Sequence, residues 1–438
     1  MSALLASKQV FPPTPEAAHA RLDAVDPQAY ARSRNHIDGA VTRLSPYLTH
    51  GLITLPEAYQ AINARTPLEP QGKLVFEFGW REYHHHVWAH LGGRIHQSLH
   101  AGLHDDASYA ALVPEDVRQA ATGIPAIDEA VRTLYATGYL HNHARMWLAS
   151  YLVHIRKVHW HAGARWMIAY LLDGDLASNH LSWQWVAGTG STKPYLFNAD
   201  NVARYAPEPW HSLGTTIDTS YEALDELARS PKSVLPRAPS QRSTVAATDE
   251  PAVLTAPPAA LGFVAPEPSA SSNSDTTPSG NVNGDANAKV SGDFNSLAGK
   301  DVWLVHAWSL GQRPPEVPAD AVCIAIAVAE FHQHNPWSAL RWNFVGQRMA
   351  DMAPVRWFGS AEAICAALAD ARCVHVAEDL HLGTFQHHLL ALAHRSHPQP
   401  LLFEPVDRRC ASFAGWWKQT RIAAHHHHIT RSAARPPA

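Results

Sequence analysis

Two polar segments lie in the middle of the chain among tryptophans and leucines, where an ordinary helical core has only apolar residues. The first is HNHARM, which starts at His141, and the second is DGDLASN, which starts at Asp173. An arginine in such apolar surroundings needs a partner, because an unpaired buried charge is prohibitively costly. Asp173 or Asp175 is the obvious partner for Arg145. The spacing therefore indicates a buried polar site between two helices.

A third segment has the chemistry of an anion site. Thr42, Ser45 and Pro46 precede a predicted helix, and the free backbone N–H groups of a helix start attract negative charge. If the segment stood alone, Ser45 would be read simply as an N-cap.

The elements that must position these residues are helices. Asn142 and Met146 are four residues apart and therefore share a helix face. Residues 73–91 form an amphipathic pattern with Glu77 and Arg81 at i and i+4, a spacing that also suits an ordinary surface ion pair. Residues 16–30 predict a short helix interrupted at Pro27. The three consecutive histidines 84–86 point in different directions around a helix and cannot share a metal, and we predict no metal site.

Composition divides the chain into three parts. Residues 14–229 are rich in Leu, Trp, Tyr and His at helical spacing, whereas residues 230–299 are dominated by Pro, Ser, Ala, Thr and Asn and predict a disordered linker. In residues 300–421 short apolar runs alternate with helical stretches, which predicts a small α/β domain with a parallel sheet. Strands are expected at 302–305, 322–328, 355–358, 373–376 and 401–403, and helices at 337–349, 361–369 and 384–394.

The overall composition excludes several classes of protein. With 438 residues, 46% of them hydrophobic, the chain has ample material for a core, and its net charge of −4 is not that of a typical nucleic-acid binder. Its four cysteines show no CxxC spacing, which argues against a disulfide framework, a zinc site or an iron–sulfur cluster. We find no secretory leader and no membrane-spanning run, so we expect a cytoplasmic protein.

The ordered motifs TGYLHNHARM and DGDLASNHLSWQW resemble the flavin-binding core of the photolyase/cryptochrome family. The segments LSPYL, WREY and TGIP agree with further motifs of that family. The resemblance implies a mainly α FAD-binding domain followed, after the linker, by an antenna-like α/β domain. Members of the family normally carry the antenna domain first. The second match rests on pattern alone, and any flavodoxin-like fold is its alternative. The residues do not identify an antenna chromophore.

The resemblance also implies roles for individual residues. Those expected to contact FAD are Tyr30, Thr42, Arg43, Leu44, Ser45, Glu77, Arg81, Tyr139, Asn142, Arg145, Asp173, Gly174, Asp175, Ser178 and Asn179. Those expected at the catalytic site are Glu77, Trp80, Asn142, Met146, Asn179 and Trp185. Family members that repair (6-4) photoproducts have two histidines where Asn142 and Met146 stand. The pattern therefore favours cyclobutane pyrimidine dimers as the substrate.

Trp160 and Trp183 match the inner two members of the family's electron-transfer chain. The third has no clear counterpart, and Tyr109, Trp88 or Trp147 would have to take its place. His143 stands where the family usually has an arginine that contacts the DNA backbone, and Leu74 where some members have a tryptophan. The loss of that arginine puts affinity for duplex DNA in doubt.

Three functions remain open on the sequence. The first is a light-driven lyase acting on damaged DNA, and the second is a cryptochrome-like photoreceptor that signals through the same FAD. The third is a flavoprotein or α/β binding module without photochemistry. Damaged DNA is the expected partner, no membrane is expected, and protein partners are unknown.

Overall fold

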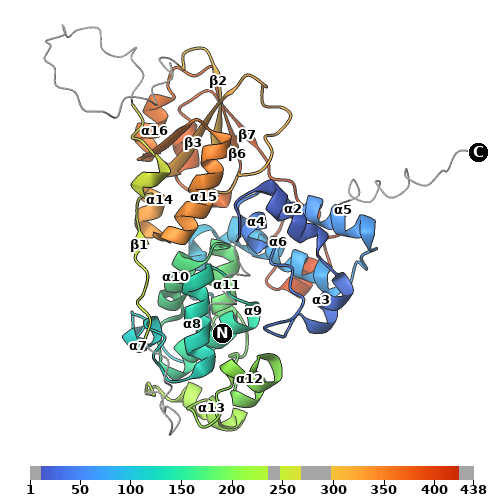
Figure 1. The fold of residues 1–438 in the computed structure, drawn as a ribbon, viewed down its shortest axis with the longest axis vertical. Coiled ribbons are helices and arrows are strands. Elements are labelled where there is room, and N and C mark those ends of the chain that lie inside the picture. Colours follow the sequence, from blue (N-terminus) through green and yellow to red (C-terminus); the bar gives the residue numbers. More distant parts are fainter. Residues whose placement is uncertain (1–10, 235–246, 268–296, 424–438) are drawn as a thin grey trace, which may run out of the picture. The chain divides into compact units, whose positions relative to one another are not determined.

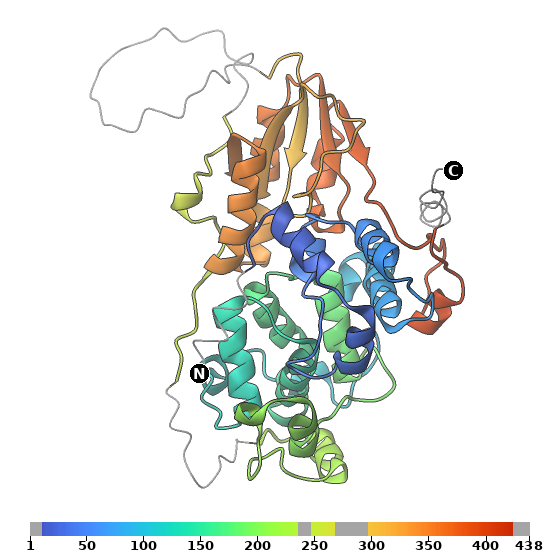
Figure 2. The same cartoon turned by 45° about the vertical axis from the view of Figure 1, so that its right-hand side comes forward.

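The computed structural model describes residues 11–234, 247–267 and 297–423, which fold as two compact units (Figures 1 and 2). Unit 1 comprises Met1–Val253, Trp337–Phe344 and Pro400–Ala438, and unit 2 comprises Leu254–Pro336 and Val345–Gln399. Unit 2 thus differs from the α/β domain that we predicted at 300–421, because residues 337–344 and 400–421 belong to unit 1. In the part of the chain that the structure describes, no helix is both long and apolar enough to cross a bilayer.

Unit 1 is mainly helical. Its α-helices are α2 Pro15–Asp23, α3 Pro27–Ser33, α4 Ser45–Thr49, α5 Leu55–Arg65, α6 Lys73–Leu91, α7 Glu115–Arg118, α8 Pro125–Thr137, α9 Asn142–Ser150, α10 Trp160–Tyr170, α11 Leu176–Ala187, α12 Ala199–Tyr205, α13 Tyr221–Arg229 and α18 Phe413–Trp417. A 3₁₀ turn, η1 Gly92–His96, follows α6, and a π-helical turn, η3 Tyr151–Ile155, follows α9.

Local signals explain where these helices begin and end. The break predicted at Pro27 is confirmed: α2 ends at Asp23, and Asp26 caps α3 by accepting hydrogen bonds from two backbone N–H groups, with Pro27 in the first turn. Helix α8 ends at Gly138, which has φ +63°. A Cβ there would lie 2.6 Å from the side chain of Leu172, so both the backbone and the packing require glycine.

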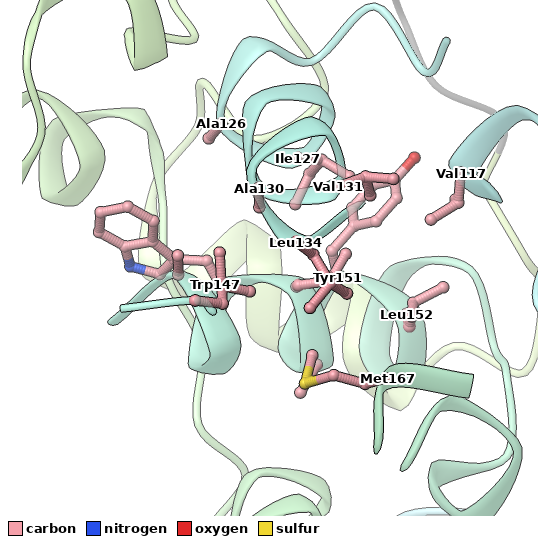
Figure 3. Close-up of a cluster of buried hydrophobic side chains, with 14 of the residues drawn as sticks. Val117, Ala126, Ile127, Ala130, Val131, Leu134, Trp147, Tyr151, Leu152 and Met167 are labelled. Atoms are coloured by element: carbon pink, nitrogen blue, oxygen red, sulfur yellow. The ribbon is translucent and has the colours of Figure 1, made fainter. Parts of the chain in front are cut away.

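The core of unit 1 forms where α8, α9, η3 and α10 pack together (Figure 3). Ile127, Val131 and Leu134 repeat at helical spacing along α8 and are fully buried. They pack with Trp147 of α9 and Met167 of α10. This core is the rigid frame on which the polar residues of α9 and α11 are held.

Unit 2 contains a five-stranded sheet in the order β5-β3-β2-β6-β7, with every neighbouring pair parallel. In chain order this is 3-2-1-4-5, which is the order of a doubly wound dinucleotide-binding sheet without its sixth strand. The strands are β2 Asp301–Val305, β3 Val322–Val328, β5 Val355–Gly359, β6 Cys373–Ala377 and β7 His394–His397. The other elements from residue 253 onward are β1 Val253–Leu254, α14 Ala329–His334, β4 Trp337–Ser338, α15 Ala339–Met352, α16 Ala361–Ala367 and α17 Phe385–Leu389.

The predicted fold class is confirmed, with local exceptions. The helix predicted at 384–394 is only the short α17, and the strand predicted at 401–403 is not part of the sheet. The fifth strand is instead β7, HRSH, which has no apolar run because it is an edge strand with two exposed residues.

Part of the predicted linker has defined structure. Glu250 pairs with Arg118 and accepts hydrogen bonds from Trp166 Nε1 at 3.0 Å and the Tyr170 hydroxyl at 2.9 Å. Further on, residue 264 forms a parallel bridge with residue 357. Disorder is therefore the wrong prediction for residues 247–267, because a single carboxylate with three donors anchors a segment that has little apolar surface. Residues 235–246 and 268–296 of the predicted linker lie outside the described residues.

Candidate functional site

A pocket of about 640 Å³ in unit 1 contains most of the predicted catalytic residues. Its lining includes Glu77 and Trp80 from α6, Asn142 and Met146 from α9, and Trp185 from α11. Both α6 and α9 pack against α11, which brings side chains more than 100 positions apart to one hollow. The sixth predicted residue, Asn179, is not part of this lining.

Asn142 and Met146 share a helix face as predicted. The Asn142 amide Nδ2 lies 3.4 Å from Met146 Sδ at the pocket. The segment HNHARM was predicted to contribute to a buried polar site, but the side chain of Asn142 within it is exposed. Trp185 is 43% exposed although it is a large aromatic residue. Exposed polar and aromatic groups around a hollow are typical of a binding pocket.

Glu77 is the acidic group of the pocket. Its Oε1 accepts a hydrogen bond of 2.8 Å from Arg34 Nη1, a partner that the sequence did not reveal. Burial raises the pKa of Glu77, and the positive charges of Arg34 and Lys73 offset only part of this rise. The buried hydroxyl of Tyr30 lies close to Glu77 and Arg34, and burial raises the pKa of Tyr30 as well. Tyr30 and Glu77 are therefore neighbours at one end of α6.

A segment near the end of the described chain forms one wall of the pocket. Residues 409–414 line it, and the ring of Phe413 stacks on Trp80 with the centroids 4.0 Å apart and the planes at 10°. The segment is held to α6 by Glu82, whose carboxylate accepts the N–H groups of Leu402 and Phe403 at 2.7 and 3.1 Å. Sequence analysis had placed this segment in the α/β domain and missed its role.

The polar site predicted between α9 and the DGD segment is present. Arg145 Nη2 lies 2.9 and 2.7 Å from the two carboxylate oxygens of Asp173, and Ser45 Oγ donates to the same carboxylate at 2.6 Å. Asp173 is therefore the partner of Arg145. The guanidinium of Arg145 also lies 5.7 Å from the ring centre of Tyr139. Four predicted cofactor residues thus converge here.

The neighbouring aspartate has a different role. Asp175 caps α11 by accepting the N–H of Ser178 at 2.7 Å, and its other oxygen lies 2.8 Å from His85 Nε2. The helix start therefore engages one oxygen of Asp175 and the histidine the other. Asn179, one position after Ser178, donates from Nδ2 to the carbonyl of Ala164 at 3.0 Å.

The segment that resembles a phosphate-binding loop has an unusual backbone and an unused donor. Arg43 has φ +52°, outside the range that most residues adopt, and its buried Nε has no hydrogen-bond partner among the described residues. The Thr42 hydroxyl accepts a hydrogen bond from the backbone N–H of Leu44. The side chain of Leu44 is fully buried, so only the backbone of this residue can contact a ligand. Arg81 Nη2 donates to Thr49 Oγ1 at 3.3 Å, at the end of α4.

An arginine distant in sequence also packs onto the DGD segment. Arg341 is only 1% exposed and donates to the carbonyl oxygens of Gly174 at 2.6 Å and Ile168 at 3.3 Å. A Cβ on Gly174 would lie 2.3 Å from Arg341 Nη1, which explains the glycine between the two aspartates. Burial lowers the pKa of Arg341 to about 9. Nothing in the sequence around Arg341 pointed to this position.

The two predicted electron-transfer tryptophans lie in one cluster. Trp160 and Trp183 are each 2% exposed. The ring of Trp183 lies so close to α10 that a Cβ on Gly163 would be 2.4 Å from it, one turn after Trp160. The ring centroids of Tyr109 and His159 are 6.1 Å apart, and those of His159 and Trp160 are 5.8 Å apart. Of the three candidates for a third member, Tyr109 is thus linked to Trp160 through one intervening ring.

His143 does not replace the missing arginine. Its ring packs against those of Tyr205 and Trp147, with centroid distances of 5.2 and 5.9 Å. Burial lowers the pKa of His143 to about 4. It is therefore neutral near pH 7 and cannot attract phosphate by charge. The pocket lining does include another cation, Arg409.

Comparisons with known proteins agree with this site. Residues 74–217 match the family described as the FAD binding domain of DNA photolyase. Deoxyribodipyrimidine photo-lyase from Streptomyces griseus is 37% identical over 156 residues, which cover 35% of this chain and 34% of that protein. Cryptochrome DASH from Gloeobacter violaceus is 30% identical over 177 residues, which cover 37% of this chain and 34% of that protein.

Among solved structures, the archaeal photolyase from Sulfolobus tokodaii with two FAD molecules gives a TM-score of 0.38 at 26% identity, with 44% of each chain covered. The matched stretches span only 34% of the length of each of the two curated relatives. The matched region contains α6, α9 and α11, the helices that build the pocket. Through residues 74–217, the chain is similar to the photolyase/cryptochrome family.

Proposed function

We propose that this chain binds FAD and splits cyclobutane pyrimidine dimers in DNA under blue light. The observation that carries the proposal is the convergence of Glu77, Trp80, Asn142, Met146 and Trp185 on one pocket. Aromatic walls with a few polar groups suit a flipped-out pyrimidine dimer, which stacks on rings and is read along its polar edge. The region that matches the FAD binding domain of DNA photolyase, residues 74–217, contains all five of these residues.

The residues present fit FAD. The buried, unpaired Nε of Arg43 at the start of α4 is a donor suited to a pyrophosphate oxygen. Ser45, Arg145 and Asp173 already form one hydrogen-bonded group that can hold the polar edge of a flavin. Asn179 carries no charge, so it can hydrogen-bond a flavin in either redox state.

When bound and reduced, FAD would supply the electron that light excitation makes available. Trp80 and Trp185 hold the dimer by stacking, and Glu77 contacts its carbonyl edge. Burial raises the pKa of Glu77, and the bond from Arg34 holds its carboxyl group at the pocket. Two carbon–carbon bonds of the cyclobutane ring break, and the electron then returns, so the reaction involves no net oxidation.

A repair assay with a single-dimer oligonucleotide tests the proposal. FAD-loaded, chemically reduced protein should remove the dimer in blue light and leave it intact in the dark, as measured by chromatography of the strand. Trp80→Ala should lower the rate at least about fivefold, because base stacking contributes about 1–3 kcal/mol, while the flavin absorbance stays the same. Loaded and reduced protein that repairs nothing in light would show that the proposal is wrong.

The stacking of Phe413 on Trp80 favours a second candidate, a cryptochrome-like photoreceptor. A dimer must displace this ring to reach Trp80, and the neutral His143 gives no help in binding DNA. In a photoreceptor the same flavin would signal through a change in this segment. Light-dependent protease sensitivity of residues 400–423 without any repair would favour this alternative.

A further inference from the structure

Three histidines from separate elements of unit 1 meet outside the pocket. His96 ends η1, His161 lies in the first turn of α10, and His180 lies on α11. One ring nitrogen from each lies within 4.8 Å of the others. The ring centroids are 4.8 to 5.8 Å apart, and the planes are inclined at 50° to 84°.

The protonation pattern of His180 leaves one nitrogen ready for a ligand. Its Nδ1 lies 2.9 Å from the carbonyl oxygen of Leu176, and a carbonyl only accepts, so Nδ1 carries the proton. Nε2 is therefore the lone-pair nitrogen. It is buried in a side chain that is 1% exposed, and it has no hydrogen-bond partner among the described residues. A histidine whose second nitrogen donates to a carbonyl is the usual arrangement of a metal ligand.

The charges around the cluster suit neutral imidazoles. Burial lowers the pKa of His180 to about 3 and that of His161 to about 4, and it also lowers the pKa of His96. Arg165 adds to all three shifts, but its exposure to solvent weakens its repulsion of a bound cation. Metal binding requires the neutral form of histidine, so the ligands need not lose protons near pH 7.

We propose that His96, His161 and His180 bind a divalent transition metal ion of the Zn²⁺ class, with solvent as the fourth ligand. Three imidazoles suit Zn²⁺, Co²⁺, Ni²⁺ or Cu²⁺ rather than Mg²⁺ or Ca²⁺. Tetrahedral Zn²⁺ with bonds of about 2.0–2.1 Å places its ligand nitrogens about 3.4 Å apart. The nitrogens must therefore approach by at most about 1.4 Å, and the half-exposed His96 and His161 have room to rotate.

The site would act as a clip between η1, α10 and α11. An ion that binds the folded chain and not the unfolded chain stabilises it by mass action, so Zn²⁺ should raise the melting temperature. The cluster also borders Trp160, whose ring centroid lies 6.2 Å from that of His180 and 5.4 Å from that of His161. Binding of the ion does not depend on flavin, so its test is independent of the proposed function.

The test uses Co²⁺ as a spectroscopic probe. Because the run His425–His428 could bind metal by itself, the measurement is made on the full chain with these four residues replaced by glutamine. Co²⁺ should give visible d–d absorption that saturates at one equivalent, and Zn²⁺ should displace it. His96→Ala and His161→Ala should each weaken binding at least tenfold and abolish the Zn²⁺-induced rise in melting temperature. His90→Ala, an exposed histidine on α6, should change neither result.

His180→Ala should abolish binding, and circular dichroism will show whether this variant is folded. If His180→Ala does not fold, the variants of the half-exposed His96 and His161 still test the proposal, because their removal leaves the core intact. The proposal would be overturned if Co²⁺ absorption still saturated at one equivalent in both His96→Ala and His161→Ala. Failure of the parent chain to bind Co²⁺ at this stoichiometry would also overturn it.

Discussion

At the scale of single residues, the site depends on one carboxylate that satisfies several donors. Asp173 is paired with Arg145 and accepts a hydrogen bond from Ser45, and its side chain is only 3% exposed. Removing one partner of a buried ion pair leaves an uncompensated charge, which costs more than the pair itself contributes. Arg145 and Ser45 therefore both depend on Asp173 for their positions.

We expect Asp173→Asn to lower the FAD content of purified protein at least tenfold, because Arg145 then has no anionic partner and turns away. The free energy of unfolding should fall by about 3–5 kcal/mol. Flavin absorbance relative to protein absorbance and urea unfolding measure the two effects. The control is Asp116→Asn, which breaks the pair with Arg156 at 2.7 Å outside the pocket. If the control loses as much flavin as Asp173→Asn, the assigned role of Asp173 is wrong.

At the scale of elements, the main contact is between α6 and α18, which begins within the pocket wall formed by residues 409–414. Helix α6 presents Trp80 to the pocket, and α18 covers that ring with Phe413. The contact of α18 with α6 is close, because a Cβ on Gly79 would lie 2.4 Å from Trp417. Access to the aromatic wall of the pocket is therefore set by the C-terminal segment.

Phe413→Ala should uncover Trp80 and increase the affinity for a dimer-containing oligonucleotide by about threefold to tenfold, since the aromatic pair to be separated is worth about 0.5–1.5 kcal/mol. Fluorescence anisotropy of the labelled oligonucleotide measures the change. In a Trp80→Ala background the same substitution should have no effect, which isolates the pairwise term. An equal gain in both backgrounds would contradict this interpretation.

The link between Glu82 and residues 402–403 should depend on pH. Burial raises the pKa of Glu82 to about 7, and the two backbone hydrogen bonds only partly oppose the rise. Because the folded-state pKa lies above the unfolded value, the folded chain holds a proton that the unfolded chain has lost. The contribution of Glu82 to stability is therefore complete below about pH 4.5 and falls by about 1.4 kcal/mol per pH unit up to about pH 7.

Urea unfolding at pH 5, 6 and 7 checks this prediction. Glu82→Gln should have a shallower decline in the free energy of unfolding over this range, because glutamine does not titrate. At pH 5 the two proteins should have similar stability, because protonated Glu82 and glutamine each have one strong acceptor oxygen. Parallel pH profiles for the two proteins would show that Glu82 does not titrate as stated.

At the scale of the whole molecule, the helical unit is discontinuous in sequence. Residues 337–344 and the segment from residue 400 return to unit 1 after the start of the parallel sheet. Arg341 belongs to the first of these returns and binds two carbonyl oxygens next to Asp173. The unit that holds the predicted FAD residues is therefore completed by residues more than 150 positions away.

Arg341→Met should lower the free energy of unfolding by about 2–4 kcal/mol, because it leaves two buried carbonyl groups without donors. It should also weaken retention of flavin, since Gly174 lies between Asp173 and Asp175. The matched control is Arg348→Met in the same helix, which removes a bond of 3.0 Å to the carbonyl of Leu310 and a surface ion pair with Asp351 at 4.0 Å. That change should cost about 1 kcal/mol and leave the flavin content intact. Equal losses for the two variants would refute the specific role of Arg341.

The sequence alone determined the resemblance to the photolyase/cryptochrome family and the local elements of the matched region. Motif order was enough to predict that Arg145 pairs with Asp173 or Asp175, because a buried cation requires a carboxylate, and the structure then identified Asp173 as the partner. Helical periodicity placed Asn142 and Met146 on one face, and apolar runs located four of the five strands of the sheet. These features depend on residues close in sequence or on a charge that must be neutralised.

Only the tertiary structure decided which distant segments complete the site. Phe413 over Trp80, Arg34 beside Glu77 and Arg341 against Gly174 are contacts between residues 43 to 333 positions apart, each worth little as a local pattern. The cluster of His96, His161 and His180 was hidden for the same reason, because its members lie on three elements. Side chains far apart in sequence meet only after the helices pack, so neither periodicity nor spacing along the chain records their contact.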